Sequence, residues 1–296
     1  QEYPEDTEAS SRTRLELLNQ LGKVHHSIRE FDKAKGYYLQ AIDLSHELDD
    51  KPSEVKALFR LGGIYFDLRE FNEARLLLEK SLNLRTQIGE RRNLAANYHM
   101  LGRVAQALRE YGEAQQNYRK ALEIDTEFGD RQSQALTYHH LGNVALELRE
   151  YEEARQNYRQ ALAICIEFAD RYSQSRSYYQ LGRVAQELRE YGEARQNYQQ
   201  ALAICIEFGN RYFQARTYDG LGCIAEKLEE FPEAKNNFLQ ALRIRHEFKD
   251  EYGVKTYTLP SFARLYQTIK DESLIEEISQ VLDITIEEVR QKLEST

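Results

Sequence analysis

The segment Leu141–Phe168, LGNVALELREYEEARQNYRQALAICIEF, recurs almost letter for letter as Leu181–Phe208, LGRVAQELREYGEARQNYQQALAICIEF. The two copies differ only at Asn143/Arg183, Leu146/Gln186, Glu152/Gly192 and Arg159/Gln199. The opening Leu-Gly pair returns every 40 residues, at Leu21-Gly22, Leu61-Gly62, Leu101-Gly102, Leu141-Gly142, Leu181-Gly182 and Leu221-Gly222. A fixed period of this length is typical of stacked supersecondary units that bury one continuous core.

Each 40-residue unit carries two helical stripes. In one unit, apolar side chains recur at steps of three and four over residues 98–108, and a second stripe covers residues 114–128. Residues 109–111 are predicted to turn the chain between these helices. Gly129 suits the left-handed position after a helix, and Asp130 suits the N-cap of the next one. Each unit is therefore predicted to be an antiparallel helix pair.

Gly102 and its equivalents are predicted to lie inside a helix, where glycine costs roughly 0.5–1 kcal/mol relative to alanine. A close approach of two helices would explain this cost. Gly102, Ala114 and Ala121 are small enough for such a crossing, and Tyr98 and Tyr118 would fill the remaining space. We interpret these positions as packing positions.

The recurring residues resemble the consensus of the tetratricopeptide repeat (TPR) family, and they are Tyr98, Leu101, Gly102, Ala105, Ala114, Tyr118 and Ala121. The resemblance covers residues 13–250 in six units. It implies an all-α fold, in which helix pairs stack into a right-handed superhelical solenoid with a concave groove formed mainly by the first helices. Function is not specified by this motif.

Three features depart from the usual repeat. The period is 40 residues rather than about 34, the consensus proline near the end of the second helix is absent, and arginine takes the turn position where many such repeats have glycine. Units of this longer type resemble those of bacterial signalling proteins, including sensor regions attached to STAND-type ATPases and CHAT domains. They also resemble those of eukaryotic adaptors that hold extended peptides.

The two ends of the chain break the pattern. Residues 1–12 are polar and lack periodicity, so we expect a flexible lead-in. Residues 251–296 are expected to form a helical cap on the last unit. Within that cap, Ser273 with Glu276 and Thr285 with Glu288 fit capping boxes that open two short helices.

Composition argues against nucleic acid and membrane partners. The net charge is -9 with a pI of about 5.5, a balance that repels a phosphate backbone. Residues 278–293 have the rhythm of a helix-turn-helix, but residues 271–296 carry eight acids against Arg290 and Lys292. No apolar run approaches the roughly 18 residues that a membrane crossing needs.

The expected compartment is the cytoplasm. The chain begins with Gln1 and shows no basic-then-apolar leader, so we expect no secretion signal, and a start without Met would fit a fragment of a longer protein. Three cysteines with no CxxC pair favour a reducing compartment. Cys165 and Cys205 share a register with Asp125 and Arg245, which predicts a half-exposed position, and they are too far apart for a disulfide.

No catalytic signature is present. The phosphate loop GxxxxGK[ST] and the patterns GxGxxG, HExxH and GxSxG are all missing. His99 and His139 share a register on successive first helices, but a ladder with that spacing does not converge on one metal ion. We therefore expect no enzyme activity, no catalytic residue, no metal and no cofactor.

Positions that differ between near-identical units are not needed to specify the fold. Positions 139, 143 and 146, with their equivalents, share one helical face. In the resembled family this face lines the groove, so the implied partner-binding residues are His99, Arg103, Gln106, His139, Asn143, Leu146, Tyr179, Arg183, Gln186, Asp219, Cys223 and Glu226. An ordinary solvated face is the alternative.

The charges of this set suggest a partner. Arg103 and Arg183 make the central part basic, whereas Asp219 and Glu226 give the C-terminal end an acidic character. We expect a non-enzymatic scaffold that binds a protein or an extended peptide with acidic residues. The alternative function is the sensor region of a larger bacterial STAND-type ATPase or CHAT-type signalling protein.

Overall fold

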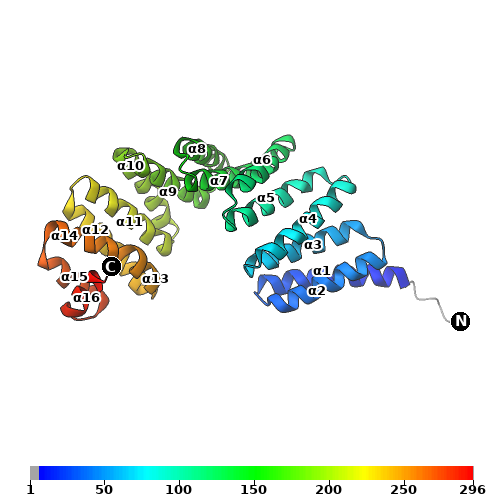
Figure 1. Ribbon diagram of the computed structural model, residues 1–296, viewed down its shortest axis with the longest axis horizontal. Coiled ribbons are helices and arrows are strands. Elements are labelled where there is room, and N and C mark those ends of the chain that lie inside the picture. The colour runs from blue at the N-terminus through cyan, green and yellow to red at the C-terminus, as the bar shows by residue number, and fades with distance from the viewer. Residues whose placement is uncertain (1–6, 296) are drawn as a thin grey trace. The chain divides into compact units, whose positions relative to one another are not determined.

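The computed structural model describes residues 7–295, in which helices account for nearly every residue and no strand occurs. The chain divides into two compact units, residues 1–144 and residues 145–296. The boundary falls inside one helix, and each unit is built from helix pairs (Figure 1). The fold is therefore all-α, with paired helices stacked on their neighbours as in a helical solenoid. The division of residues 13–250 into six repeats stays a prediction.

The paired helices follow one another at nearly constant length. They are α1 (Thr7–Ser27), α2 (Phe31–Glu47), α3 (Lys51–Asp67), α4 (Phe71–Gln87), α5 (Arg91–Ala107), α6 (Tyr111–Glu127), α7 (Arg131–Glu147), α8 (Tyr151–Glu167), α9 (Arg171–Glu187), α10 (Tyr191–Glu207), α11 (Arg211–Lys227) and α12 (Phe231–Glu247). From α2 onward each has 17 residues and is followed by a three-residue turn, at least as far as α12. Two such helices and two such turns account for the 40-residue period.

The turns use left-handed backbone conformations. Within a pair the left-handed residue is an arginine, with φ of 63° at Arg109 and 61° at Arg189, and Glu229 takes the same conformation at 61°. Between pairs Gly129 has φ of 67°, and the Asp130 side chain accepts a hydrogen bond from the Ser133 amide at 3.0 Å. Both predictions for that link, the left-handed glycine and the N-cap, are confirmed.

The small residues mark a close helix crossing, as predicted. A methyl group on Gly102 would lie 2.7 Å from the Tyr118 ring, which is closer than two carbon atoms can approach. Ala114, Ala121 and Tyr118 are fully buried. The glycine therefore lets a large aromatic ring lie flat against α5, and the buried ring offsets the low helix propensity of glycine.

Successive pairs are also joined by ion pairs on their surface. The glutamate before each second helix makes no side-chain cap. Three of these glutamates instead pair with an arginine of the preceding helix pair, in Arg75–Glu110, Arg155–Glu190 and Arg195–Glu230. Exposed pairs of this kind contribute little individually, and their repetition explains why the same glutamate recurs in the sequence.

The lead-in expected over residues 1–12 is helical from Thr7, where α1 begins, and its flexibility stays a prediction. The Thr13 hydroxyl donates to the Ala9 carbonyl oxygen within this helix. Leu15 and Leu18 of the same helix are buried. Their packing stabilises α1, which therefore begins before the first apolar residue of the repeat. Residues 1–6, which the same expectation included, lie outside the described residues.

The shared position of the two cysteines is buried rather than half exposed. Cys165 is 5% exposed and Cys205 1%, and the charged equivalents Asp125 and Arg245 are 7% and 3% exposed. The prediction failed because it took a charged residue as a sign of exposure. Arg245 is tolerated there because it pairs with Asp219 of the preceding helix, at 2.6 Å.

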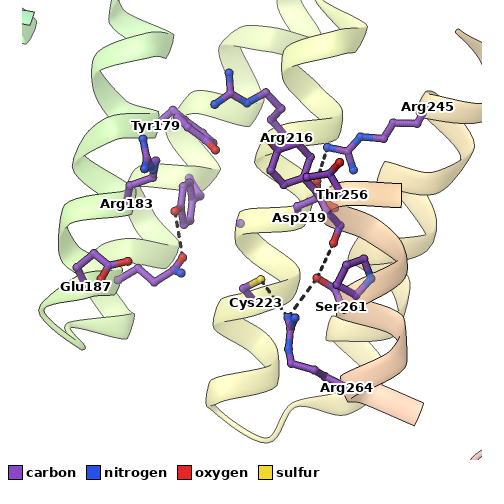
Figure 2. Close-up of a pocket in the computed structure, with 15 residues that line it drawn as sticks. Tyr179, Arg183, Glu187, Arg216, Asp219, Cys223, Arg245, Thr256, Ser261 and Arg264 are labelled. Carbon is purple, nitrogen blue, oxygen red and sulfur yellow. Dashed lines mark hydrogen bonds and ion pairs between the residues drawn. The ribbon is translucent and has the colours of Figure 1, made fainter. Parts of the chain in front are cut away.

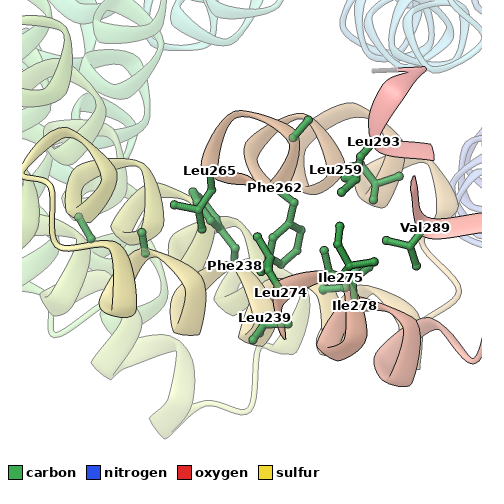
Figure 3. Close-up of a cluster of buried hydrophobic side chains, with 14 residues drawn as sticks. Phe238, Leu239, Leu259, Phe262, Leu265, Leu274, Ile275, Ile278, Val289 and Leu293 are labelled. Carbon is green, nitrogen blue, oxygen red and sulfur yellow. The ribbon is translucent and has the colours of Figure 1, made fainter. Parts of the chain in front are cut away.

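The C-terminal residues form short helices on the last pair. α13 (Glu251–Gly253) continues through a π-helical turn, η1 (Val254–Thr258), into α14 (Leu259–Ile269), and α15 (Glu272–Leu282) and α16 (Ile286–Glu294) follow. Pro260 lies in the first turn of α14, where proline needs no amide donor. Figure 3 shows Phe238 and Leu239 of α12 gathered with Phe262, Leu274 and Ile278 in one buried cluster.

One of the two predicted capping boxes forms. Thr285 and Glu288 exchange both hydrogen bonds at the start of α16, as predicted. The Ser273 box is wrong, because α15 begins at Glu272 with Asp271 as its N-cap. The Asp271 carboxylate accepts from both the amide and the hydroxyl of Ser273, at 3.0 and 2.8 Å, and so occupies the group that the box would use.

Candidate functional site

The twelve predicted groove residues fall in both units. The first unit holds His99, Arg103, Gln106, His139 and Asn143. The second unit holds Leu146, Tyr179, Arg183, Gln186, Asp219, Cys223 and Glu226.

Two of the predicted residues do not present an open side chain. His139 is 7% exposed and Leu146 is 8% exposed. Leu146 belongs to a buried cluster with Ala154 and Tyr158 of α8. The expectation that these two side chains line an open face is therefore wrong, whereas the binding role of the other ten stays a prediction.

The second unit contains a cavity of about 310 Å³ that collects five of the predicted residues. Three come from α9 and two from α11, and they are Tyr179, Arg183, Gln186, Asp219 and Cys223. Figure 2 shows these two helices on one side and η1 with α14 on the other. The stacking of first helices thus brings together residues that lie 40 positions apart in the sequence.

Sequence reasoning missed much of the lining of this cavity, including the whole of its opposite wall. The missed residues come from α11, α12, η1 and α14, namely Arg216, Arg245, Thr256, Tyr257, Pro260, Ser261 and Arg264. Arg216 lies one turn before Asp219 on a helix that was already implicated, so the helical period could have found it. The residues beyond Arg245 lie after the last repeat, where no equivalent position in another unit predicts which side chains line a cavity.

The predicted acidic end of the groove is neutralised. Asp219 forms an ion pair with Arg245 at 2.6 Å (Figure 2). The Thr258 hydroxyl accepts from Arg245 and donates to Asp219. Glu226 pairs with Arg264 at 3.3 Å. The expectation of an acidic C-terminal end is therefore wrong, because Arg245 at the end of α12 and Arg264 of α14 neutralise its two carboxylates.

In the described part of the chain, two arginines of the cavity lack a direct ion pair, although Arg216 attracts the Asp219 carboxylate at longer range. The Arg183 guanidinium donates to the neutral Gln180 side chain at 3.1 Å. Arg216 lies over the Tyr179 ring, 5.1 Å from its centroid, and near Phe213. Within residues 7–295 neither forms an ion pair with a carboxylate. Four arginines and two carboxylates line the cavity, so its field favours anionic groups.

The remaining groups suit binding rather than catalysis. The Tyr198 hydroxyl donates to the Gln186 side-chain oxygen at 3.1 Å, which leaves the amide nitrogen of Gln186 to donate into the cavity. Burial raises the pKa of the Cys223 thiol to about 11, so the thiol stays protonated at neutral pH and is a poor nucleophile.

In the first unit, His99 and Arg103 line a second cavity, of about 390 Å³. Arg103 lies over the Phe66 ring at 4.4 Å, and burial lowers the pKa of His99 to about 4. The histidine ring that meets His99 is His140 rather than His139, with centroids 5.0 Å apart. Among the residues that the structure describes, no three His, Cys, Asp or Glu side chains gather as metal ligands would.

Comparison with protein families decides the classification. The tetratricopeptide repeat model matches residues 13–87, 56–127, 93–167 and 173–247. The chain belongs to the tetratricopeptide repeat family. Comparison with curated protein sequences finds no significant match. Over the described residues of this TPR protein, no helix has the length and apolar character that a membrane span requires.

Solved structures show the same fold at low identity. The apo form of RapI is 18% identical, with a TM-score of 0.71 over 95% of this TPR chain and 99% of that chain. Aspartyl phosphate phosphatase F from Bacillus subtilis is 15% identical, with a TM-score of 0.69 over 97% of this chain and 72% of that chain. A STAND protein with a tetratricopeptide repeat sensor from Pyrococcus horikoshii is 16% identical, with a TM-score of 0.69 over 92% of this chain and 42% of that chain.

Proposed function

We propose that this chain is a non-enzymatic scaffold whose second unit binds an extended protein segment with acidic residues. Tetratricopeptide repeats commonly bind proteins or peptides, which supports the general role. The observation that carries the finer proposal is the pair Arg183 and Arg216, which line one cavity without a carboxylate partner in the described residues. The proposed compartment is the cytoplasm, in keeping with three cysteines that form no disulfide.

The chemistry of the cavity fits an anionic segment. A guanidinium binds a carboxylate through two parallel hydrogen bonds, and hydrogen bonds to charged groups contribute about 1.5–3 kcal/mol each. The Tyr179 ring supports the planar face of Arg216, which limits the side-chain entropy lost on binding. The free amide of Gln186 would hold the backbone of the segment, a role that we also assign to Gln106 and Asn143 in the first unit.

Charge reversal tests the proposal. The double variant Arg183→Glu/Arg216→Glu should lose at least about tenfold in affinity for a partner captured by crosslinking from native lysate, because two attractive contacts become repulsive. The measurement is a quantitative pull-down of that partner, with circular dichroism to verify folding. Arg103→Glu should weaken capture only if the segment also contacts the first unit.

The chain offers a matched control for this experiment. Arg149→Glu/Arg189→Glu changes charge by the same amount at two exposed turns outside the cavity, and Glu229 already occupies the equivalent turn with the same left-handed backbone. This variant should capture the partner as well as the unmodified chain. Equal capture by the double variant, or equal loss in the control, would contradict a specific role for the cavity.

A second candidate function is the sensor region of a larger signalling ATPase. The STAND protein with a tetratricopeptide repeat sensor supports it, since 92% of this chain aligns with 42% of that chain. Sequencing the reading frame on either side of this segment tests the idea. A nucleotide-binding module joined to these repeats would support the sensor role, and stop codons at both ends would support a freestanding adaptor.

A further inference from the structure

The cavity of the first unit contains a buried carboxyl group without a counter-charge. Asp125 lies at the end of α6 and is 7% exposed. It lines the cavity together with residues of α5 and the first turns of α7. Within residues 7–295 no cation forms an ion pair with it, and the charged neighbour that most affects it is Asp130, whose effect is repulsive. A carboxylate that is mostly buried and has no ion-pair partner is costly to ionise.

The other charged and titratable groups of the cavity do not compensate Asp125. On α5, Arg103 lies over the Phe66 ring and Arg92 is exposed, while burial keeps His99 neutral near pH 7. At the start of α7, Asp130 is itself an acid, and its carboxylate caps the helix. The end of the cavity near Asp125 and Asp130 is therefore anionic, and a cation that enters there would pair with the Asp125 carboxylate.

The fold does not require a carboxylate at this position. The equivalent residues are Cys165 and Cys205 in the second unit. Gln134 donates to the Asp125 backbone oxygen at 3.1 Å, and the equivalent glutamines make the same bond to both cysteines, at 3.0 and 2.9 Å. Backbone packing is thus the same with either side chain, and the carboxyl group of Asp125 is left without a structural role.

Two more polar atoms of this cavity lack a partner. The Thr137 hydroxyl belongs to a residue that is 1% exposed, and it makes no hydrogen bond in the described part of the chain. The same is true of His99 Nε2. Both residues line the cavity, and Ile124 and Leu136 give it apolar walls. Buried polar atoms are nearly always bonded, so these two can form hydrogen bonds with a group that enters the cavity.

We propose that this cavity is a second binding site, which takes the cationic end of a lysine or arginine side chain from a protein partner. Asp125 supplies the counter-charge, the Thr137 hydroxyl accepts one further hydrogen bond, and the aliphatic part of the incoming side chain lies along Ile124 and Leu136. The site lies in the first unit and does not depend on the cavity proposed for acidic segments.

Small mimics of the side chain test this assignment on the full chain. Butylguanidinium carries the arginine head group and stem, and butylurea is its neutral counterpart of nearly the same shape. Butylguanidinium should shift the NMR signal of the Thr137 methyl group with a dissociation constant in the millimolar range, and butylurea should bind at least about tenfold more weakly. Bound cation should also lower the pKa of Asp125, measured from its carboxyl carbon signal.

Two variants separate binding from folding. Asp125→Cys installs the residue that the chain uses at positions 165 and 205, and Asp125→Asn keeps the shape of the side chain. Both should remain folded and bind butylguanidinium at least about tenfold more weakly. Equal binding of butylurea, unchanged binding to both variants, or no saturable shift of Thr137 up to about 50 mM butylguanidinium would overturn the proposal.

Discussion

Asp125 and His99 have pKa values that are shifted in opposite directions by the same cause. Burial, with repulsion from Asp130, raises the pKa of Asp125 to about 6, and burial lowers that of His99 to about 4. A raised carboxyl pKa stabilises the fold at low pH, and that contribution is lost as the pH rises to the folded-state value. A lowered histidine pKa does the reverse, so the two effects oppose each other between about pH 4 and pH 6.

Asp125→Asn should expose the first of these effects. Relative to this variant, the unmodified chain should lose about 2–3 kcal/mol of unfolding free energy as the pH rises from about 4 to about 7, because the buried carboxyl must ionise. Urea unfolding of both proteins at the two pH values measures the difference. Two stability profiles that stay parallel across this range would show that the Asp125 carboxyl is solvated.

Single residues also show what the sequence can and cannot predict. The contact between Gly102 and Tyr118 at a helix crossing was predicted correctly, because small residues at helical spacing indicate a close crossing regardless of context. The exposure of Arg245 could not be deduced in the same way. Its partner Asp219 lies 26 residues earlier on a different helix, and pairing across helices is invisible to a period within one helix.

At the scale of the element, the start of α16 depends on one hydroxyl group. Thr285→Ala should cost about 1 kcal/mol, since it removes the bond to the Glu288 amide, and the loss should loosen the packing of Val289 and Leu293. Faster hydrogen exchange of the α16 amides is the expected result. Ser273→Ala is the control, because Asp271 still caps α15 through the backbone amide. If Ser273→Ala accelerated hydrogen exchange in α15 as much as Thr285→Ala does in α16, this account of the two caps would be contradicted.

The two capping predictions had the same sequence signal and different outcomes. The deciding residue was Asp271, two positions before Ser273, since a carboxylate accepts the amide bond better than a hydroxyl. The π-helical turn at Val254–Thr258 could not be anticipated either. It lies where the 40-residue period ends, and no neighbouring repeat supplies a template for it.

At the scale of the whole molecule, the repeat explains the fold better than it explains the site. The period and the helical stripes predicted the helix pairs of both units, since each pair is specified locally and by its immediate neighbour. In the second unit the register also brought Tyr179, Arg183 and Gln186 to one cavity with Asp219. The acidic character predicted for the C-terminal end of the groove was wrong, because Asp219 pairs with Arg245 and Glu226 pairs with Arg264 of the non-repeating end.

Site-specific photocrosslinking tests the central claim most directly. A photoreactive benzoylphenylalanine at Tyr179 lies in the proposed site, and the same residue at Tyr172 lies on the same helix but outside the cavity, where the native side chain is 54% exposed. The account predicts that position 179 crosslinks to an acidic segment of the partner and that position 172 does not. Crosslinking at position 172 with none at position 179 would contradict it.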